Sequence, residues 1–266
     1  KYRKGEKTLF FKDSEGNPLA GKKVKITQKN HDFKYGANIF MLDEFGKSED
    51  NAEYRRFFKE YFNFATLPFY WNTLEPNEGK MRFEKNSEKI YRRPAPELCM
   101  EYCRENGITP KLHCLYYDKF TPDWCAADDE KTLLLKLEKR FSEIAERYCG
   151  KMFEFEVTNE LFVVKERKTV LARKRGIINI CFELARKYFP NEKLTINEAN
   201  PIPDIARLDY YSPYFLQCEN LLNQGVPIDR IGLQNHLFVG ASSRTPESYE
   251  AQMRERYYWN DPFMYY

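Results

Sequence analysis

Four apolar runs in this sequence end on polar side chains that could carry out chemistry. The runs close on Lys111-Leu112-His113-Cys114-Leu115, Val157-Thr158-Asn159-Glu160, Ile196-Asn197-Glu198 and Gly232-Leu233-Gln234-Asn235-His236. Carboxyl, carboxamide and imidazole groups transfer protons and hydrogen-bond hydroxyl groups. In barrels of parallel strands, reacting groups sit at the C-terminal ends of the strands. The ends of these runs are therefore the predicted site.

Glu160 is the residue of this set best placed to donate a proton. A carboxylic acid that donates a proton near neutral pH needs a raised pKa, and a strand end ringed by aromatic residues supplies the necessary desolvation. The amide of the neighbouring Asn159 can donate to a hydroxyl group of a substrate. The same Asn-Glu pair could instead cap a following helix, and these two residues alone favour neither interpretation.

The elements that must position these residues follow a regular alternation from residue 35 onward. Short apolar runs predict strands at 35–40, 62–68, 110–116, 153–158, 193–196 and 230–234. Amphipathic stretches between them predict helices at 52–61, 95–106, 130–149, 169–189 and 208–224. This is the pattern of parallel strands joined by crossover helices. It predicts an α/β fold, a (β/α)8 TIM barrel of about 250 residues, rather than a doubly wound sheet with its glycine-rich first turn.

The barrel is expected to be incomplete at its C-terminus, since the chain is short by about two βα units. Before the first barrel strand, the apolar run 8–11, the turn 13–18 and the alternating run 24–27 predict a short β-hairpin. The predicted organisation is an N-terminal β extension over residues 1–34 and a truncated barrel over 35–266.

Composition excludes several other classes of protein. The 266 residues are 42% hydrophobic and 31% charged, which fits one large globular core and argues against disorder. The 43 basic and 40 acidic residues are spread along the chain, so no nucleic-acid partner is expected. No run approaches the roughly 20 apolar residues of a membrane span, so no membrane partner is expected.

The seven cysteines show no CxxC pair and no His/Cys metal spacing, and most are expected to be buried thiols. Cys99 and Cys103 lie four residues apart on a predicted helix and could form part of a metal site, but packing on one helix face is favoured. The cysteines therefore predict no metal site.

An ordered set of segments decides between the two interpretations of Glu160. The set comprises Tyr70-Trp71-Asn72-Thr73-Leu74-Glu75-Pro76-Asn77-Glu78-Gly79, Glu105-Asn106-Gly107-Ile108, Leu112-His113-Cys114-Leu115, Thr121-Pro122-Asp123-Trp124, Phe155-Glu156-Val157-Thr158-Asn159-Glu160, Leu194-Thr195-Ile196-Asn197-Glu198-Ala199-Asn200 and Ile231-Gly232-Leu233-Gln234-Asn235-His236. Each segment is a weak match by itself. In this order and spacing they resemble the family ten xylanases, glycoside hydrolases with a (β/α)8 fold, over most of the chain.

The resemblance implies roles for seven residues. Glu160 is the acid/base, Asn159 contacts the sugar 2-hydroxyl, His113 binds the glycone sugar, Gln234 and His236 position the nucleophile, Tyr117 offers a ring for stacking, and Trp71 is a substrate contact or a core residue. The implied activity is a retaining endo-β-1,4-glycanase that hydrolyses xylan-type polysaccharide by double displacement, a mechanism that requires neither a metal nor an organic cofactor. A polymeric substrate implies a secreted or periplasmic protein.

The sequence departs from the family pattern in two respects, which keep other functions open. The first is the loss of polar residues in two segments. The segment Thr66-Leu67-Pro68-Phe69-Tyr70-Trp71 stands where the family has Glu-Asn-x-Met-Lys-Trp, and Tyr117-Asp118 stands where it has Trp-His, so sugar hydroxyls lose hydrogen-bond partners. The alternatives are an inactive or carbohydrate-binding barrel and a hydrolase of another β-glycan.

The second departure concerns the nucleophile. Retention needs a second carboxylate about 5 to 5.5 Å from the first, which in the family lies in an Ile-Thr-Glu segment of the seventh strand. No such segment occurs in residues 1–266. The remaining acidic residues after His236 are Glu247, Glu250, Glu255 and Asp261. Residues 246–256 predict a polar helix, so these are expected to be solvated charges and the nucleophile is expected beyond Tyr266.

Overall fold

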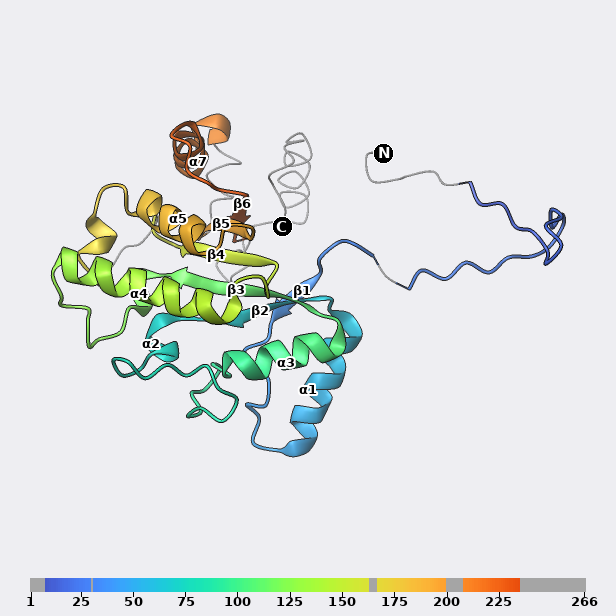
Figure 1. Cartoon of the computed structure of the whole chain (residues 1–266), viewed down its shortest axis with the longest axis horizontal. Helices are drawn as coiled ribbons and strands as arrows, with labels where there is room; N and C mark the ends of the chain where they lie inside the picture. Colours follow the sequence, from blue (N-terminus) through green and yellow to red (C-terminus); the bar gives the residue numbers. More distant parts are fainter. Residues whose placement is uncertain (1–7, 30, 163–166, 200–207, 235–266) are drawn as a thin grey trace, which may run out of the picture. The chain divides into compact units, whose positions relative to one another are not determined.

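Six parallel strands form the centre of the structure, a computed structural model that describes residues 8–29, 31–162, 167–199 and 208–234 (Figure 1). The strands are β1 (Gly36–Asn38), β2 (Phe64–Pro68), β3 (Thr109–Tyr116), β4 (Glu154–Asn159), β5 (Lys193–Glu198) and β6 (Arg230–Leu233). They are hydrogen-bonded in their order along the chain, β1-β2-β3-β4-β5-β6. This topology is that of an incomplete (β/α)8 barrel, and it confirms the predicted fold class.

Helices connect successive strands, as a parallel sheet requires. They are α1 (Ser48–Tyr61), α2 (Trp71–Leu74), α3 (Pro96–Asn106), α4 (Glu130–Tyr148), α5 (Ile177–Tyr188) and α7 (Pro213–Asn223). The helix predicted over 169–189 is shorter than expected. A 3-10 turn occupies Leu171–Arg173, and Gly176, with φ of 79°, separates it from α5. The helix predicted from residue 208 likewise starts as α7 at Pro213, where the hydroxyl of Ser212 caps it by accepting from the Phe215 N–H.

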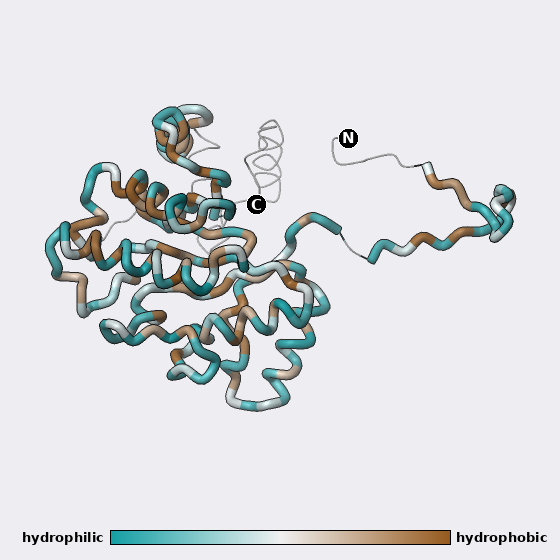
Figure 2. Tube along the Cα trace, in the orientation of Figure 1, coloured by the Kyte–Doolittle hydropathy of each residue, from teal (hydrophilic) through white to brown (hydrophobic). Residues whose placement is uncertain are grey.

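The core lies between one face of the sheet and the helices packed on it. Leu112, Phe155 and Leu194 occupy paired positions on β3, β4 and β5 and are fully buried. Residues on the helices, such as Leu137 of α4 and Phe182 of α5, belong to the same cluster. Figure 2 shows brown hydrophobic segments interspersed with teal ones along these helices. Each such side chain contributes about 1.5–3 kcal/mol when fully buried.

Alternation along each strand places the intervening residues on the opposite, inward face of the sheet. His113, Glu156 and Thr195 lie one position further along β3, β4 and β5 than the three core residues, and they are paired with one another in the register. The inward face is therefore polar, and it leads to the strand ends where the predicted site lies.

Two glycines make the fold possible at points of close approach or unusual backbone. A Cβ on Gly36 would lie 2.0 Å from the carbonyl oxygen of Phe64, so β1 can pair closely with β2 only without a side chain at this position. Gly107 adopts the left-handed conformation, with φ of 66°, and ends α3 at Asn106 as the sequence predicts.

The described residues before residue 35 form a separate unit. The predicted turn is present. The Asp13 carboxylate accepts from the N–H groups of Glu15 and Asn17, both at 2.9 Å, and a single bridge joins Lys12 to Pro18. The predicted strands at 8–11 and 24–27 are wrong, because within the described residues neither run forms a strand. Their apolar side chains, among them Phe10 and Ile26, are exposed, so no burial stabilises the pairing.

Among the described helices, none combines the length and the apolar character that crossing a membrane requires.

Candidate active site

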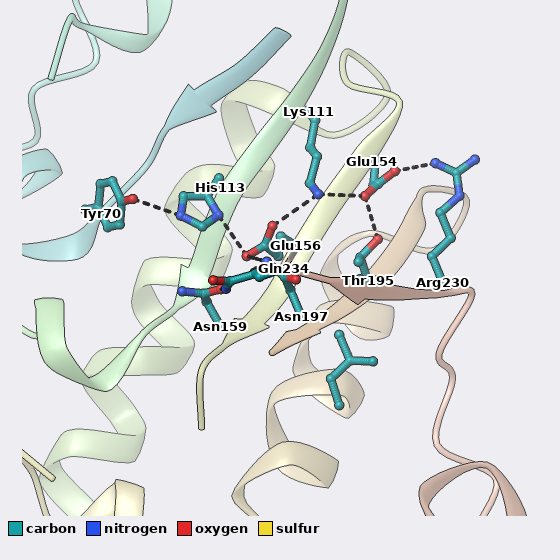
Figure 3. Close-up of polar contacts among 12 residues, drawn as sticks. Tyr70, Lys111, His113, Glu154, Glu156, Asn159, Thr195, Asn197, Arg230 and Gln234 are labelled. Carbon is teal, nitrogen blue, oxygen red and sulfur yellow. Dashed lines mark hydrogen bonds and ion pairs between the residues drawn. The ribbon is translucent and has the colours of Figure 1, made fainter. Parts of the chain in front are cut away.

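The polar ends of β3 to β6 meet because the strands are parallel and in register. The register pairs His113 with Glu156, and Asn159 with Asn197. Figure 3 shows their side chains pointing toward one another, with Gln234 beside them at the end of β6. The four runs that the sequence singled out thus contribute to one cluster.

Glu156 lies at the centre of this cluster and is 1% exposed. Its Oε1 is 2.8 Å from Nδ1 of His113 and accepts from Nδ2 of Asn197 at 3.1 Å. Its Oε2 lies 3.2 Å from Nζ of Lys111. Burial opposes the charge of this carboxylate, but His113, Lys111 and the bond from Asn197 outweigh it and lower the pKa of Glu156 to about 2. Glu156 is therefore an anion that only accepts hydrogen bonds.

Both ring nitrogens of His113 have partners. Nε2 lies 2.9 Å from the hydroxyl of Tyr70, whose pKa burial raises, so that this hydroxyl stays protonated and can donate. The carboxylate of Glu156 can only accept, so Nδ1 of His113 must carry a proton. Nδ1 of His113 therefore donates to Glu156, and Nε2 forms a hydrogen bond with the Tyr70 hydroxyl, which can donate or accept.

The side-chain amide of Asn159 is oriented in the same way. Its Oδ1 accepts from Nδ2 of Asn197 at 3.1 Å and from Nε2 of Gln234 at 2.9 Å. Since the oxygen is held by two donors, the amino group is the end of this amide that remains to donate to a ligand.

Glu160 is the first residue after β4 and has an unusual backbone. Its φ of 52° lies in the left-handed region, and its N–H donates to the carbonyl oxygen of Asn197 at 3.0 Å. Its carboxylate accepts a hydrogen bond from the hydroxyl of Tyr117. Burial and this contact with Glu160 raise the pKa of Tyr117, so the phenol remains a donor. Backbone conformations of this kind cluster at functional sites.

An aromatic wall, formed by Tyr70, Tyr117 and Phe120, lies beside His113. The ring centroids of Tyr70 and Phe120 are 4.3 Å apart, and those of Tyr117 and Phe120 are 5.1 Å apart. The guanidinium of Arg93 lies 4.2 Å from the centroid of the Tyr70 ring. The wall covers the His113 side of the cluster with rings and one cation.

Trp71 is 3% exposed and packs inside the molecule. Its indole N–H donates to Oε2 of Glu75 at 2.9 Å, and its ring meets Trp124 edge to face at 6.3 Å. These contacts fit the core alternative for Trp71, and its role as a substrate contact stays a prediction.

Four residues of this cluster were given no role from the sequence: Tyr70, Lys111, Glu156 and Asn197. The period of two along a strand was the available signal, because it places Lys111 with His113 and Glu154 with Glu156 on the inward face. Glu154 is fully buried and pairs with Lys111 at 3.2 Å and with Arg230. Thr195 also donates to Glu154, at 2.7 Å.

Several predicted residues lie outside the described residues. They are His236, the acidic residues Glu247, Glu250, Glu255 and Asp261, and the helix predicted over 246–256.

Within the described residues, one group has the ligand types and spacing of a metal site. Donor atoms of His113, Cys114 and Glu156 lie within 4.8 Å of one another. However, His113 and Glu156 are already bonded to each other, and burial raises the pKa of the Cys114 thiol well above its usual range, which disfavours the thiolate that a metal would bind. We assign no metal to this group, and the absence of a cofactor stays a prediction.

Comparison with known proteins gives consistent matches. The family model for glycosyl hydrolase family 10 matches residues 29–258. Endo-1,4-beta-xylanase 2 of Claviceps purpurea is 29% identical over 242 residues, which cover 89% of this chain and 65% of the fungal protein. The anti-sigma-I factor RsgI6 of Acetivibrio thermocellus is 26% identical over 242 residues, 88% of this chain and 28% of that protein.

The solved structures agree in fold. Xylanase 10B from Thermotoga petrophila RKU-1, in complex with xylobiose, aligns with a TM-score of 0.63 at 20% identity, over 85% of this chain and 65% of that one. The chain thus spans less than two thirds of the length of each of these relatives.

Proposed function

Because the chain belongs to glycosyl hydrolase family 10, we propose that it acts as a retaining endo-β-1,4-xylanase-type hydrolase on xylan-type polysaccharide. The observation that carries the proposal is the pairing, at the end of β4, of the Glu160 carboxyl with the Tyr117 hydroxyl, beside an Asn159 amide whose amino group is left to donate. The xylanases among the relatives support the choice of substrate class.

In this mechanism Glu160 acts twice. It first donates its proton to the leaving glycosidic oxygen, and it then accepts a proton from the water that hydrolyses the covalent glycosyl-enzyme. The Tyr117 hydroxyl holds the carboxylate in place between the two steps, and the amino group of Asn159 donates to the sugar 2-hydroxyl. The second carboxylate that double displacement requires is not assigned to any described residue.

The remaining site residues have supporting roles in the proposal. His113 lies on the glycone side, Tyr117 offers its ring for stacking, and Gln234, together with His236, positions the nucleophile. We further propose that residues 1–34 form an extension separate from the barrel over residues 35–266, and that the protein is secreted or periplasmic, where polymeric xylan is accessible.

The test compares Glu160→Ala with the unchanged chain on two substrates. On xylan, reducing-sugar release is expected to fall by about 10² to 10⁴-fold, the usual contribution of acid–base catalysis. On an aryl xylobioside with a dinitrophenolate leaving group the first step needs no proton, so that step should be nearly retained and azide should restore turnover. Glu105→Ala, an exposed glutamate of α3, is the matched control and should change neither rate. Xylan hydrolysis that survives Glu160→Ala would refute the role of Glu160.

A carbohydrate-binding barrel is the second candidate. The matches to xylanases do not favour it, and the one observation in its direction is that the Tyr70 hydroxyl lies 2.9 Å from Nε2 of His113. Binding of xylohexaose by the unchanged chain without release of reducing sugar would favour this candidate, and release from β-glucan but not from xylan would change the substrate.

A further inference from the structure

We propose that Glu156 is a positioning residue that couples the orientation of His113 to that of Asn159 through a single carboxylate oxygen. The coupling is a property of the described residues, whereas its importance for catalysis rests on the proposed function. Three observations carry the proposal: the sharing of Oε1, the space that Gly232 leaves, and the ion pairs that hold Oε2.

The shared oxygen joins two branches of hydrogen bonds. From Oε1 of Glu156, one branch runs through His113 to Tyr70, and the other runs through Asn197 to Asn159. The amino group of Asn197 has two hydrogens, and it donates one to Oε1 of Glu156 and the other to Oδ1 of Asn159, both at 3.1 Å. Asn197 therefore cannot rotate without releasing both carboxyl and amide.

A glycine on the neighbouring strand gives Asn197 the room for this orientation. Gly232 of β6 faces the Asn197 side chain, and a Cβ added at residue 232 would lie 2.6 Å from Oδ1 of Asn197 and 3.0 Å from its Cγ. Real Cβ atoms do not approach that closely, so Asn197 would have to move. The second branch thus depends on the absence of a side chain on β6.

The other oxygen of Glu156 is held by a balanced set of buried charges. Lys111 Nζ lies 3.2 Å from Oε2 of Glu156 and 3.2 Å from Oε1 of Glu154, and Arg230 also pairs with Glu154. Two cations thus face two carboxylates on the inward face of the sheet (Figure 3). Because the Lys111 ammonium only donates, the atom of residue 156 that faces it must be an acceptor. Oε2 fills this position, and Oε1 is left to accept from His113 and Asn197.

This arrangement makes Glu156→Gln an informative change. A glutamine must turn its amide oxygen toward the Lys111 ammonium, so its amino group faces His113 and Asn197. An amino group only donates, so it cannot accept from Nδ1 of His113 or from the Asn197 amino group. One isosteric substitution should therefore break the hydrogen bond to His113 and release the Asn159 amide together.

The experiment is ¹⁵N NMR of the full chain above neutral pH. The chain has three histidines, so the His113 ring signals can be assigned with His31→Gln and His236→Gln. The unchanged chain is expected to show a protonated Nδ1. Glu156→Gln is expected to shift the Nδ1 signal of His113 and the side-chain amide resonances of Asn159.

The matched control is Glu154→Gln, which removes the neighbouring buried carboxylate of the same strand and face but no contact of His113 or Asn197. It should leave the Nδ1 signal of His113 unchanged even if stability falls. Gly232→Ala should also shift the Asn159 amide resonances, because the added side chain displaces Asn197. This variant tests the branch from Asn197 to Asn159 if Glu156→Gln does not fold.

A bare Nδ1 of His113 in the unchanged chain, or unchanged His113 and Asn159 signals in folded Glu156→Gln, would overturn the proposal. So would unshifted Asn159 signals in Gly232→Ala. None of these signals depends on hydrolysis, so the coupling can fail or hold independently of the proposed function.

Discussion

The variant Glu160→Gly is expected to be more stable than Glu160→Ala, although both changes remove the same carboxyl group. Both variants lose the carboxylate and its bond from Tyr117, so they differ only in the backbone. At φ of 52°, an L residue carries a cost of about 1–2 kcal/mol that glycine does not. About 0.4–1 kcal/mol of this advantage of glycine is lost because glycine makes the unfolded chain more flexible. The net gain for Glu160→Gly over Glu160→Ala is therefore about 0.5–1 kcal/mol.

The assay is equilibrium urea unfolding, in which the midpoint should rise at an unchanged slope. A thermal scan should show Tm higher by about 1–4 °C for a chain of this size. Ala52→Gly, at an exposed position in α1, is the control of opposite sign and should cost about 0.5–1 kcal/mol. If Glu160→Gly were no more stable than Glu160→Ala, the backbone cost attributed to this strand end would be wrong.

Three further outcomes are expected. Arg140→Leu should lower the free energy of unfolding in urea by about 3 kcal/mol or more, because buried Arg140 donates to three backbone carbonyls at the ends of β2 and β3. The control Lys139→Leu, at an exposed position, should change it by less than about 0.5 kcal/mol, and equal effects would contradict this. Trp71→Phe should cost about 1.5–3 kcal/mol through the lost bond to Glu75 with KM for xylan unchanged, and a raised KM would instead make Trp71 a substrate contact. The pKa of Glu156 is lowered to about 2 in the folded state from an ordinary value of 4.5, so its contribution to stability is present above about pH 4.5 and is lost as the pH falls toward 2. Glu156→Gln should therefore make the free energy of unfolding less dependent on pH in that window. An equally steep pH dependence would argue against an ionised Glu156.

The sequence predicted the strands well because their apolar runs are local and strongly patterned. Each of the six predicted strands overlaps an observed one, and β6 differs from its predicted range of 230–234 only at its last residue. The predictions failed where one residue outweighed the pattern. Gly176 interrupts the apolar periodicity of the helix expected over 169–189. The N-terminal run 24–27 alternates like a strand, but within the described residues its side chains have no core to enter.

Motif order predicted the family, which the comparisons confirm. Position at the end of an apolar run, a local property, indicated His113, Asn159, Glu160 and Gln234 as candidates, and the ordered motifs selected them as site residues. The structure brings these strand ends together. Their chemical roles remain predictions.

Only the tertiary structure decided which atoms meet. Glu156 was read as one letter of a motif, but its partner His113 lies 43 residues away on the preceding strand, and Asn197 lies 41 residues away on the next. A sequence pattern assigns a side chain to a face, whereas its partner depends on the register between strands, and packing of the whole sheet sets that register. The orientation of the Asn159 amide and the proton on Nδ1 of His113 follow from those contacts alone. Glu160 could thus be found from the sequence, but the hydrogen bonds that orient its neighbours could not.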